Sequence, residues 1–117
     1  MFNISKNNII TLTRGDTANY IFDINLGTKL QPEFYNLKDN DTIYLGVMEN
    51  NQLFENALIR KVFKKKEDEE PSSSILIEFK HNDTIKVLPG DYWYEIKLHI
   101  GDTDEIITLV QQQFIIL

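Results

Sequence analysis

The segment LPGDYWYEIKLHI, from Leu88 to Ile100, constrains the fold more than any other part of the chain. After a Pro-Gly turn its residues alternate strictly between two sets. Because successive side chains of a β-strand point to opposite faces, this alternation predicts a strand with one buried and one outward face. The predicted inward set is Tyr92, Tyr94, Ile96, Leu98 and Ile100, and the outward set is Trp93, Glu95, Lys97 and His99.

Strand patterns also dominate the rest of the chain. Short runs rich in β-branched and aromatic residues, bounded by Gly, Pro, Asn or Asp, are typical of strands. Seven strands are predicted, at 9–13, 17–26, 41–49, 58–63, 74–80, 91–100 and 105–117, with a short helical turn at 81–87. We therefore expect a single domain, residues 1–117, folded as an all-β, immunoglobulin-like antiparallel β-sandwich of about seven strands. In such sandwiches a tyrosine at a strand start bonds to the backbone upstream, and Tyr92 is the candidate for this structural corner.

Local patterns predict further details of the strands and loops. The inward residues of 41–49 are expected to be Ile43, Leu45 and Val47, and the outward ones Tyr44 and Met48. The run at 61–74, KVFKKKEDEEPSSS, changes from basic to acidic and then to Pro-Ser; it cannot pack and predicts a solvated, mobile hairpin loop. Alternation breaks at Gln111–Gln113, which predicts a bulge in the last strand. The apolar end of that strand is expected to pair within the chain, with pairing to a partner chain as the second possibility.

The overall composition excludes several classes of protein. Twelve basic and eighteen acidic residues give a net charge of −6, which disfavours nucleic acid as a partner because phosphates are bound mainly by Lys and Arg. The absence of cysteine excludes disulfides and thiolate chemistry. No apolar run approaches the ~18 residues of a membrane-spanning helix, so no membrane partner is expected. The first residues, MFNISKNNII, lack the pattern of a signal peptide, and we expect a complete short chain made in the cytoplasm.

Catalytic chemistry is sparse in this sequence. The two histidines, His81 and His99, lie in a predicted turn and on the polar face of a strand, without the spacing of a metal pair or of a nucleophile and its base. The sequence contains no glycine-rich phosphate loop, nucleophile elbow or HExxH motif. A non-enzymatic protein with no catalytic residues, no cofactor and no metal is therefore expected.

Two further motifs have both a structural and a functional interpretation. The acidic turns at 39–41 and 102–105 offer the oxygen ligands that calcium prefers, but they lack the spacing of an EF-hand. Arg14-Gly15-Asp16 spells the integrin-binding tripeptide, yet it lies between two predicted strands, where Gly15 more simply supplies a turn with positive φ. Both motifs are interpreted as turn chemistry.

Outward aromatic residues are the remaining candidates for function. Trp93, Tyr44 and Tyr35 are compatible with exposed side chains of no particular role, with a protein interface, or with a platform on which a sugar ring stacks. The apolar C-terminus favours the interface, because an apolar strand left bare promotes association. The candidate partner surface consists of Trp93, Tyr44, Met48, Ile115 and Leu117.

The order of these motifs resembles that of a known group of proteins. The relevant segments are ITLTRGDT at 10–17, DTI at 41–43, ALIRK at 57–61, NDT at 82–84, LPGDYWYEI at 88–96, and IIT at 106–108 with Phe114 beyond it. This series resembles the small immunoglobulin-like β-sandwich proteins encoded among the tail genes of prophages in Gram-positive bacteria and, more loosely, the N-terminal domain of phage baseplate upper proteins. The chain departs from that pattern at the charged run 64–70 and at the Pro-containing segment 29–35, both in loops.

The resemblance implies a structural protein of a phage tail or baseplate. Its partners would be other phage structural proteins or further copies of itself, and it would be made in the bacterial cytoplasm and end in the virion. The family supplies no catalytic residues to transfer to this chain. The alternative function is a carbohydrate-binding or adhesion domain that uses Trp93 and nearby aromatic residues.

Overall fold

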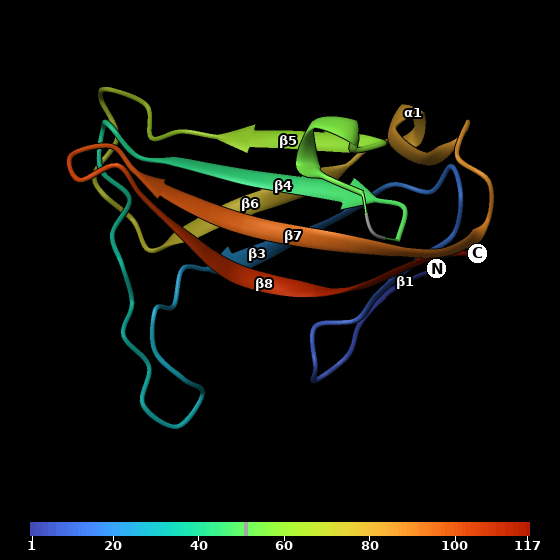
Figure 1. Cartoon of the computed structure of the whole chain (residues 1–117), viewed down its shortest axis with the longest axis horizontal. Helices are drawn as coiled ribbons and strands as arrows, with labels where there is room; N and C mark the ends of the chain where they lie inside the picture. The colour runs from blue at the N-terminus through green and yellow to red at the C-terminus, as the bar shows by residue number, and fades with distance from the viewer. Residues whose placement is uncertain (51) are drawn as a thin grey trace.

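The alternating segments fold into eight strands and two short helical turns (Figure 1). The computed structural model describes residues 1–50 and 52–117. The strands are β1 (Phe2–Ile4), β2 (Ile10–Leu12), β3 (Ala18–Asp23), β4 (Thr42–Met48), β5 (Ile59–Phe63), β6 (Ser74–Phe79), β7 (Gly90–Ile100) and β8 (Glu105–Ile116); the turns are η1 (Phe54–Asn56) and α1 (His81–Thr84). The seven predicted strands and the turn after β6 are confirmed. β1 is additional, because its three residues are shorter than the runs that mark a strand in sequence.

The strands form two sheets that pack as a sandwich. The larger sheet has the order β1-β2-β8-β7-β4-β5, and the smaller one pairs β3 with β6. The all-β sandwich expected from the sequence is confirmed, with one amendment to its antiparallel character, since β2 runs parallel to β8. The aromatic ring of Phe79 in the small sheet meets that of Phe114 in the large sheet edge to face, with ring centroids 5.4 Å apart.

β7 forms the centre of the large sheet, paired along its length with β8 on one side and β4 on the other. Its alternation is as predicted, because Tyr92, Tyr94, Ile96 and Leu98 are buried. The Tyr92 hydroxyl donates a hydrogen bond to the Leu88 carbonyl at 2.5 Å, the contact that defines a tyrosine corner. The Tyr94 hydroxyl donates to the Asn8 carbonyl at 2.5 Å, which ties the β1–β2 turn to the core.

The bulge of the last strand is not at Gln111–Gln113, where the sequence predicted it. Those glutamines pair in regular register with Trp93, Tyr94 and Glu95, and the register shifts two residues before Gln111, where Leu109 is left without an opposite residue. Gln112 does occupy an inward position, but its amide donates to the Asn7 carbonyl at 3.2 Å. The alternation of apolar and polar residues is therefore broken by an inward, hydrogen-bonded glutamine and not by a bulge at this position.

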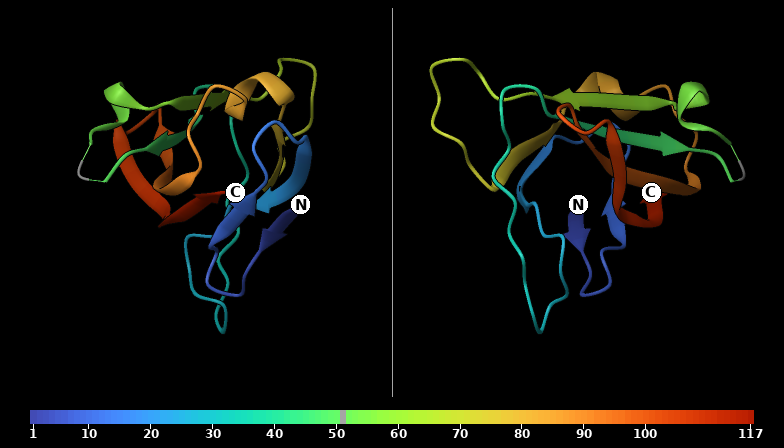
Figure 2. Two further views of the ribbon diagram at one scale, coloured as in Figure 1. Left: turned by 90° about the vertical axis from the view of Figure 1, so that its right-hand side faces the viewer. Right: turned by 60° about the vertical axis from the view of Figure 1, so that its left-hand side comes forward.

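The charged segment between β5 and β6 is not the predicted hairpin loop. β5 is an edge of the large sheet and β6 belongs to the small one, so the segment carries the chain from one sheet to the other (Figure 2). It is also not fully solvated, because the Lys65 side chain is only 9% exposed and its ammonium pairs with Asp39 at 2.7 Å. The long aliphatic stem of a lysine allows such partial burial.

Candidate functional site

The side chains of the large sheet that point away from the small sheet form a broad surface, here called the outer face. Residues directly opposite each other on neighbouring strands share a face. Trp93 lies opposite Met48, Lys97 opposite Tyr44, and Asp91 opposite Ile115. The structure therefore brings four of the five predicted partner residues to one face of one sheet.

The outer face has an exposed apolar part. Ile106 is 67% exposed, Val62 56% and Trp93 36%, although all three lie on regular strands. Val62 pairs with Tyr44 across β4 and β5, and Ile106 pairs with His99 across β7 and β8. Val62 and Ile106 were not among the residues predicted from the sequence. Their alternation along β5 and β8, combined with the pairing of these strands to β4 and β7, would have placed them on the outer face.

An aromatic pair divides this surface into two hollows. Phe54, in η1, lies over the sheet and meets Tyr44 edge to face at 5.8 Å, while the Arg60 guanidinium lies 5.8 Å from the Phe54 ring centre. A shallow apolar hollow of about 190 Å³ is lined by Tyr44, Phe54, Lys97, His99 and Ile106. Its floor is the sheet itself, so its shape is set by strand pairing.

The second hollow lies beside Trp93 and is more polar. It measures about 410 Å³ and is lined by Met48, Glu49, Asn50, Gln52, Trp93, Glu95 and Gln111. Gln111 and Glu95 hold each other in position, because the Gln111 side-chain amide donates a hydrogen bond to the Glu95 carboxylate at 3.1 Å. Lys97 pairs with the same carboxylate at 3.5 Å. A half-exposed indole beside ordered carboxylate and amide groups can contact either a protein or a sugar.

The prediction that Met48 belongs to the partner surface needs a correction. It does lie on the outer face, but it is only 3% exposed and therefore cannot make a free contact. The ring of Phe54 packs over the strand beside Met48: Phe54 and the Met48 sulfur lie 2.5 Å and 3.1 Å from the point where a β-carbon on Gly46 would stand. The missing side chain at Gly46 leaves room for this cover.

Ile115 and Leu117 lie toward the β2 side of the sheet, where the two termini meet. Ile115 is half-buried and Leu117 is 50% exposed. The Leu117 amide donates to the Leu12 carbonyl and its carbonyl accepts from the Arg14 amide, each at 3.0 Å. The C-terminal segment is thus paired within the chain, as expected, and only its last side chain is free.

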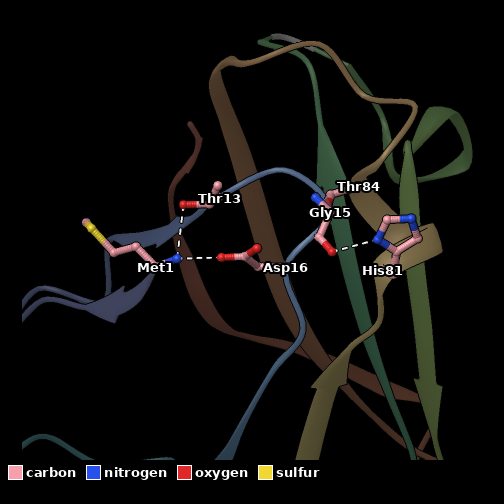
Figure 3. Close-up of polar contacts among 6 residues, drawn as sticks. All are labelled: Met1, Thr13, Gly15, Asp16, His81 and Thr84. Carbon is pink, nitrogen blue, oxygen red and sulfur yellow. Dashed lines mark hydrogen bonds and ion pairs between the residues drawn. The ribbon is translucent and has the colours of Figure 1, made fainter.

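The Arg14-Gly15-Asp16 turn is held by the rest of the protein (Figure 3). Gly15 has φ of +82°, the conformation predicted for it. Its amide donates to the Thr84 hydroxyl at 2.8 Å, and its carbonyl accepts from His81 Nδ1 at 2.8 Å. The Asp16 carboxylate forms an ion pair with the N-terminal ammonium, at an N···O distance of 2.5 Å. A turn pinned at three points is not a projecting recognition loop, which supports the structural interpretation.

The two acidic turns lie side by side. The Asp41 carboxylate is 1% exposed and accepts from the Tyr35 hydroxyl at 2.6 Å, the Lys38 amide at 2.9 Å and the Gly101 amide at 3.2 Å. This carboxylate therefore already accepts three hydrogen bonds within the protein. Among residues 1–50 and 52–117, no group of three acidic, histidine or cysteine side chains is arranged to hold a metal ion.

Three tyrosines have raised pKa values. Burial, and then the hydrogen bond to Asp41, raises the pKa of Tyr35 to about 12. Burial also raises the pKa of Tyr20 and of Tyr94 above the usual value. Among the described residues, neither histidine bonds to a second histidine or to a nucleophile: His81 contacts the Gly15 carbonyl, and His99 contacts the Asp104 carboxylate at 2.6 Å. Buried neutral tyrosines of this kind contribute to packing.

Comparisons with protein-family models, with curated proteins and with solved structures gave no match to the chain. In the part of the chain that the structure describes, no helix is long and apolar enough to cross a membrane. The outer face is therefore the main basis for a functional proposal.

Proposed function

We propose that the protein is a non-enzymatic assembly component that binds another protein chain through the outer face of its large sheet. The observation that carries this proposal is the exposure of Trp93, Val62 and Ile106 on a sheet whose opposite face supplies most of the buried core. Trp, Tyr and Arg are the residues that most often dominate protein interfaces, and the outer face offers Trp93, Tyr44 and Arg60 together.

The surroundings of these residues fit the anatomy of an interface. Charged groups flank the apolar hollow, with Lys97 and Glu95 on one side and the His99–Asp104 pair on another. An apolar centre with a polar rim is the usual arrangement at protein contacts. Because the contacts rest on paired strands and not on loops, little side-chain and backbone freedom would be lost on binding.

We further propose that the setting is a phage tail or baseplate. The support is the resemblance of the motif order to small sandwich proteins of prophage tail regions. In that setting the partners are other structural proteins of the particle or additional copies of this chain. Mass spectrometry of purified virions from the lysogenic host tests this part of the proposal: the protein should be present in stoichiometric amounts, and its absence from the particle would refute it.

The contact itself is tested by self-association and by binding to the proteins encoded by neighbouring genes. Sedimentation velocity of the full chain, alone and with each neighbour, should reveal a defined complex. Trp93→Ser and Ile106→Ser should each weaken that complex by about tenfold or more, as expected when a central apolar contact is removed. Leu30→Ser is the matched control, since Leu30 is 95% exposed but lies on a distant loop. Equal weakening by all three variants would contradict the proposal.

A carbohydrate-binding function is the second candidate, and the polar hollow beside Trp93 favours it. An aromatic ring with ordered carboxylate and amide groups around it is suited to a sugar, which presents both an apolar face and hydroxyls. A glycan array followed by calorimetry separates the two functions. Saturable sugar binding that is lost in both Trp93→Ala and Gln111→Ala would replace the assembly proposal, whereas silence on the array together with a defined protein complex supports it.

A further inference from the structure

The small sheet has an unpaired edge along β3. Ile24, directly after β3, donates its amide to the Ser73 carbonyl on the β6 side at 2.6 Å. In an antiparallel ladder only alternate residues direct their backbone N–H and C=O groups to the partner strand. The backbone groups of Phe22 and Tyr20 therefore also point toward β6. Asn19, Ile21 and Asp23 then direct theirs to the opposite edge. Within residues 1–50 and 52–117, no strand pairs with β3 on that side.

This edge lacks the usual protection. Sheet edges are commonly shielded by Lys, Pro, a bulge or a very short strand. β5, an edge of the large sheet, carries Arg60 and Lys61, and β1 has only three residues. β3 has six residues, ANYIFD, with one charge at its end and with Ile21 69% exposed.

A groove of about 670 Å³ runs beside the same edge. Tyr20, Phe22, Leu109 and Val110 give it an apolar lining, and Ile4 and Phe34 flank it. The Lys29 ammonium donates to the Lys6 carbonyl, which joins the 25–34 hairpin to the β1–β2 turn. Figure 2 shows these two segments projecting on the same side of the sandwich.

We propose that this groove binds an extended peptide segment of another protein, which adds to β3 as a further strand. Three unpaired backbone amides and three carbonyls in a row are complementary to the backbone of a strand. Alternate side chains of the added strand would enter the apolar groove, so these should be apolar. Lys29 is engaged with the Lys6 carbonyl, and the other charged group of the lining is Asp23, whose carboxylate accepts from the neutral Ser74 hydroxyl at 2.6 Å and so keeps its charge; the segment therefore carries a basic residue beside Asp23.

A second copy of the chain fits this edge less well than a single strand. A two-fold axis would bring the same β1–β2 turn and the same 25–34 hairpin from both molecules to one edge. An isolated strand has only the width of its own backbone and side chains. The site is separate from the outer face, so it does not depend on the proposed assembly function.

The test is an NMR titration of the full chain with the synthetic peptide acetyl-KVTVTVK-amide, which carries a basic residue at each end. The amides of Asn19, Ile21 and Asp23 should shift and become protected from hydrogen exchange. The same peptide methylated at each central backbone nitrogen should not bind. Shifts centred elsewhere, or equal binding by the methylated peptide, would overturn the proposal.

Two variants make the test specific to the β3 edge. Ile21→Pro removes an amide that faces the edge, a position where proline is tolerated in a strand, and should weaken binding by about tenfold or more, whereas Ile21→Val should bind like the parent. Asp23→Lys should reverse the preference from KVTVTVK to EVTVTVE. Equal binding by Ile21→Pro and Ile21→Val, an unchanged preference in Asp23→Lys, or a dimer of the free protein that Ile21→Pro dissociates would each contradict the proposed occupant.

Discussion

The two sheets of this protein differ in how their backbones are used. In the large sheet β7 is paired on both sides from Trp93 to His99, and its central inward side chains, Tyr94, Ile96 and Leu98, are at most 2% exposed. In the small sheet, as far as the described residues go, β3 and β6 are paired only with each other, and Ile21 and Leu76, which lie opposite one another, are both exposed. The large sheet thus combines a central strand paired on both sides with a free face, while the two-stranded small sheet has a free backbone edge along β3.

This difference assigns different kinds of recognition to the two sheets. A free face binds through side chains, so its partner is selected by shape and by apolar and charged contacts. A free edge binds through the backbone, so its partner must be extended, whatever its sequence, with specificity added by alternate side chains. The predictions below test whether the two sheets are as unequal as the structure indicates.

The largest effect is expected in the core between the sheets. Phe114 is 0% exposed and meets Phe79 and Tyr94 with ring centroids 5.4 Å and 6.0 Å away. Phe114→Ala should lower the free energy of unfolding by about 3–5 kcal/mol, because it removes a buried ring and leaves a cavity. Phe34→Ala, at a ring that is 58% exposed, should change it by less than about 0.5 kcal/mol. Urea denaturation measures both, and comparable losses would contradict the assignment of the core.

The next effect concerns the buried carboxylate at the end of the large sheet. Asp41→Ala should cost about 3 kcal/mol, since it leaves the Tyr35 hydroxyl and two backbone amides without their acceptor. Asp41→Asn retains one acceptor oxygen and should cost about half as much. Asp68→Ala, in the exposed segment between the sheets, serves as the control. A cost for Asp41→Ala no larger than that of the control would show that the hydrogen bonds to the Asp41 carboxylate do not stabilise the fold.

A smaller effect should appear at alkaline pH. The pKa of Tyr35 is raised to about 12 in the folded protein from the usual 10.0. Above pH 10 the unfolded chain loses this proton while the folded chain keeps it, so stability should fall as the pH rises from about 10 to 12. Thermal unfolding across this range measures the fall, which should be shallower in Tyr35→Phe. An identical slope in the variant would mean that Tyr35 titrates normally.

The smallest effect is expected on the small sheet. Ile21→Thr should change the free energy of unfolding by less than about 0.5 kcal/mol, although Ile21 lies in the middle of a strand, because its side chain is mostly in water. Ile77→Thr, at a fully buried position of β6, should cost several times more. A large loss in Ile21→Thr would indicate that the outer side of this sheet is covered in solution.

Much of this architecture could be predicted from the sequence, because strand alternation and turn residues are local signals. The alternation of β7 and the positive φ of Gly15 were both predictable for this reason. Features that depend on distant residues were not. The Phe54 ring packs against β4 beside Met48 because Gly46 has no side chain, and no local pattern in the sequence indicates this contact.

The same limit applies to sheet membership and to the candidate sites. A turn between two strands does not reveal whether they pair, so the segment between β5 and β6 was predicted as a hairpin loop when it joins two sheets. Trp93 was identified because the alternation of residues 91–100 places its side chain on the outward face of the strand. The β3 edge was missed because an unpaired edge is defined by the absence of a neighbour, which only the three-dimensional arrangement shows.

Residue-resolved hydrogen exchange of the free protein tests the contrast between the two sheets most directly. The amides of Tyr94 and Ile96 in β7, and those of Tyr20 and Phe22 in β3, should exchange slowly. The amides of Asn19, Ile21 and Asp23 should exchange faster than their neighbours in β3 by about a hundredfold or more, because they have no partner strand. Uniform protection along β3 would contradict the account, since it would mean that this edge is already paired.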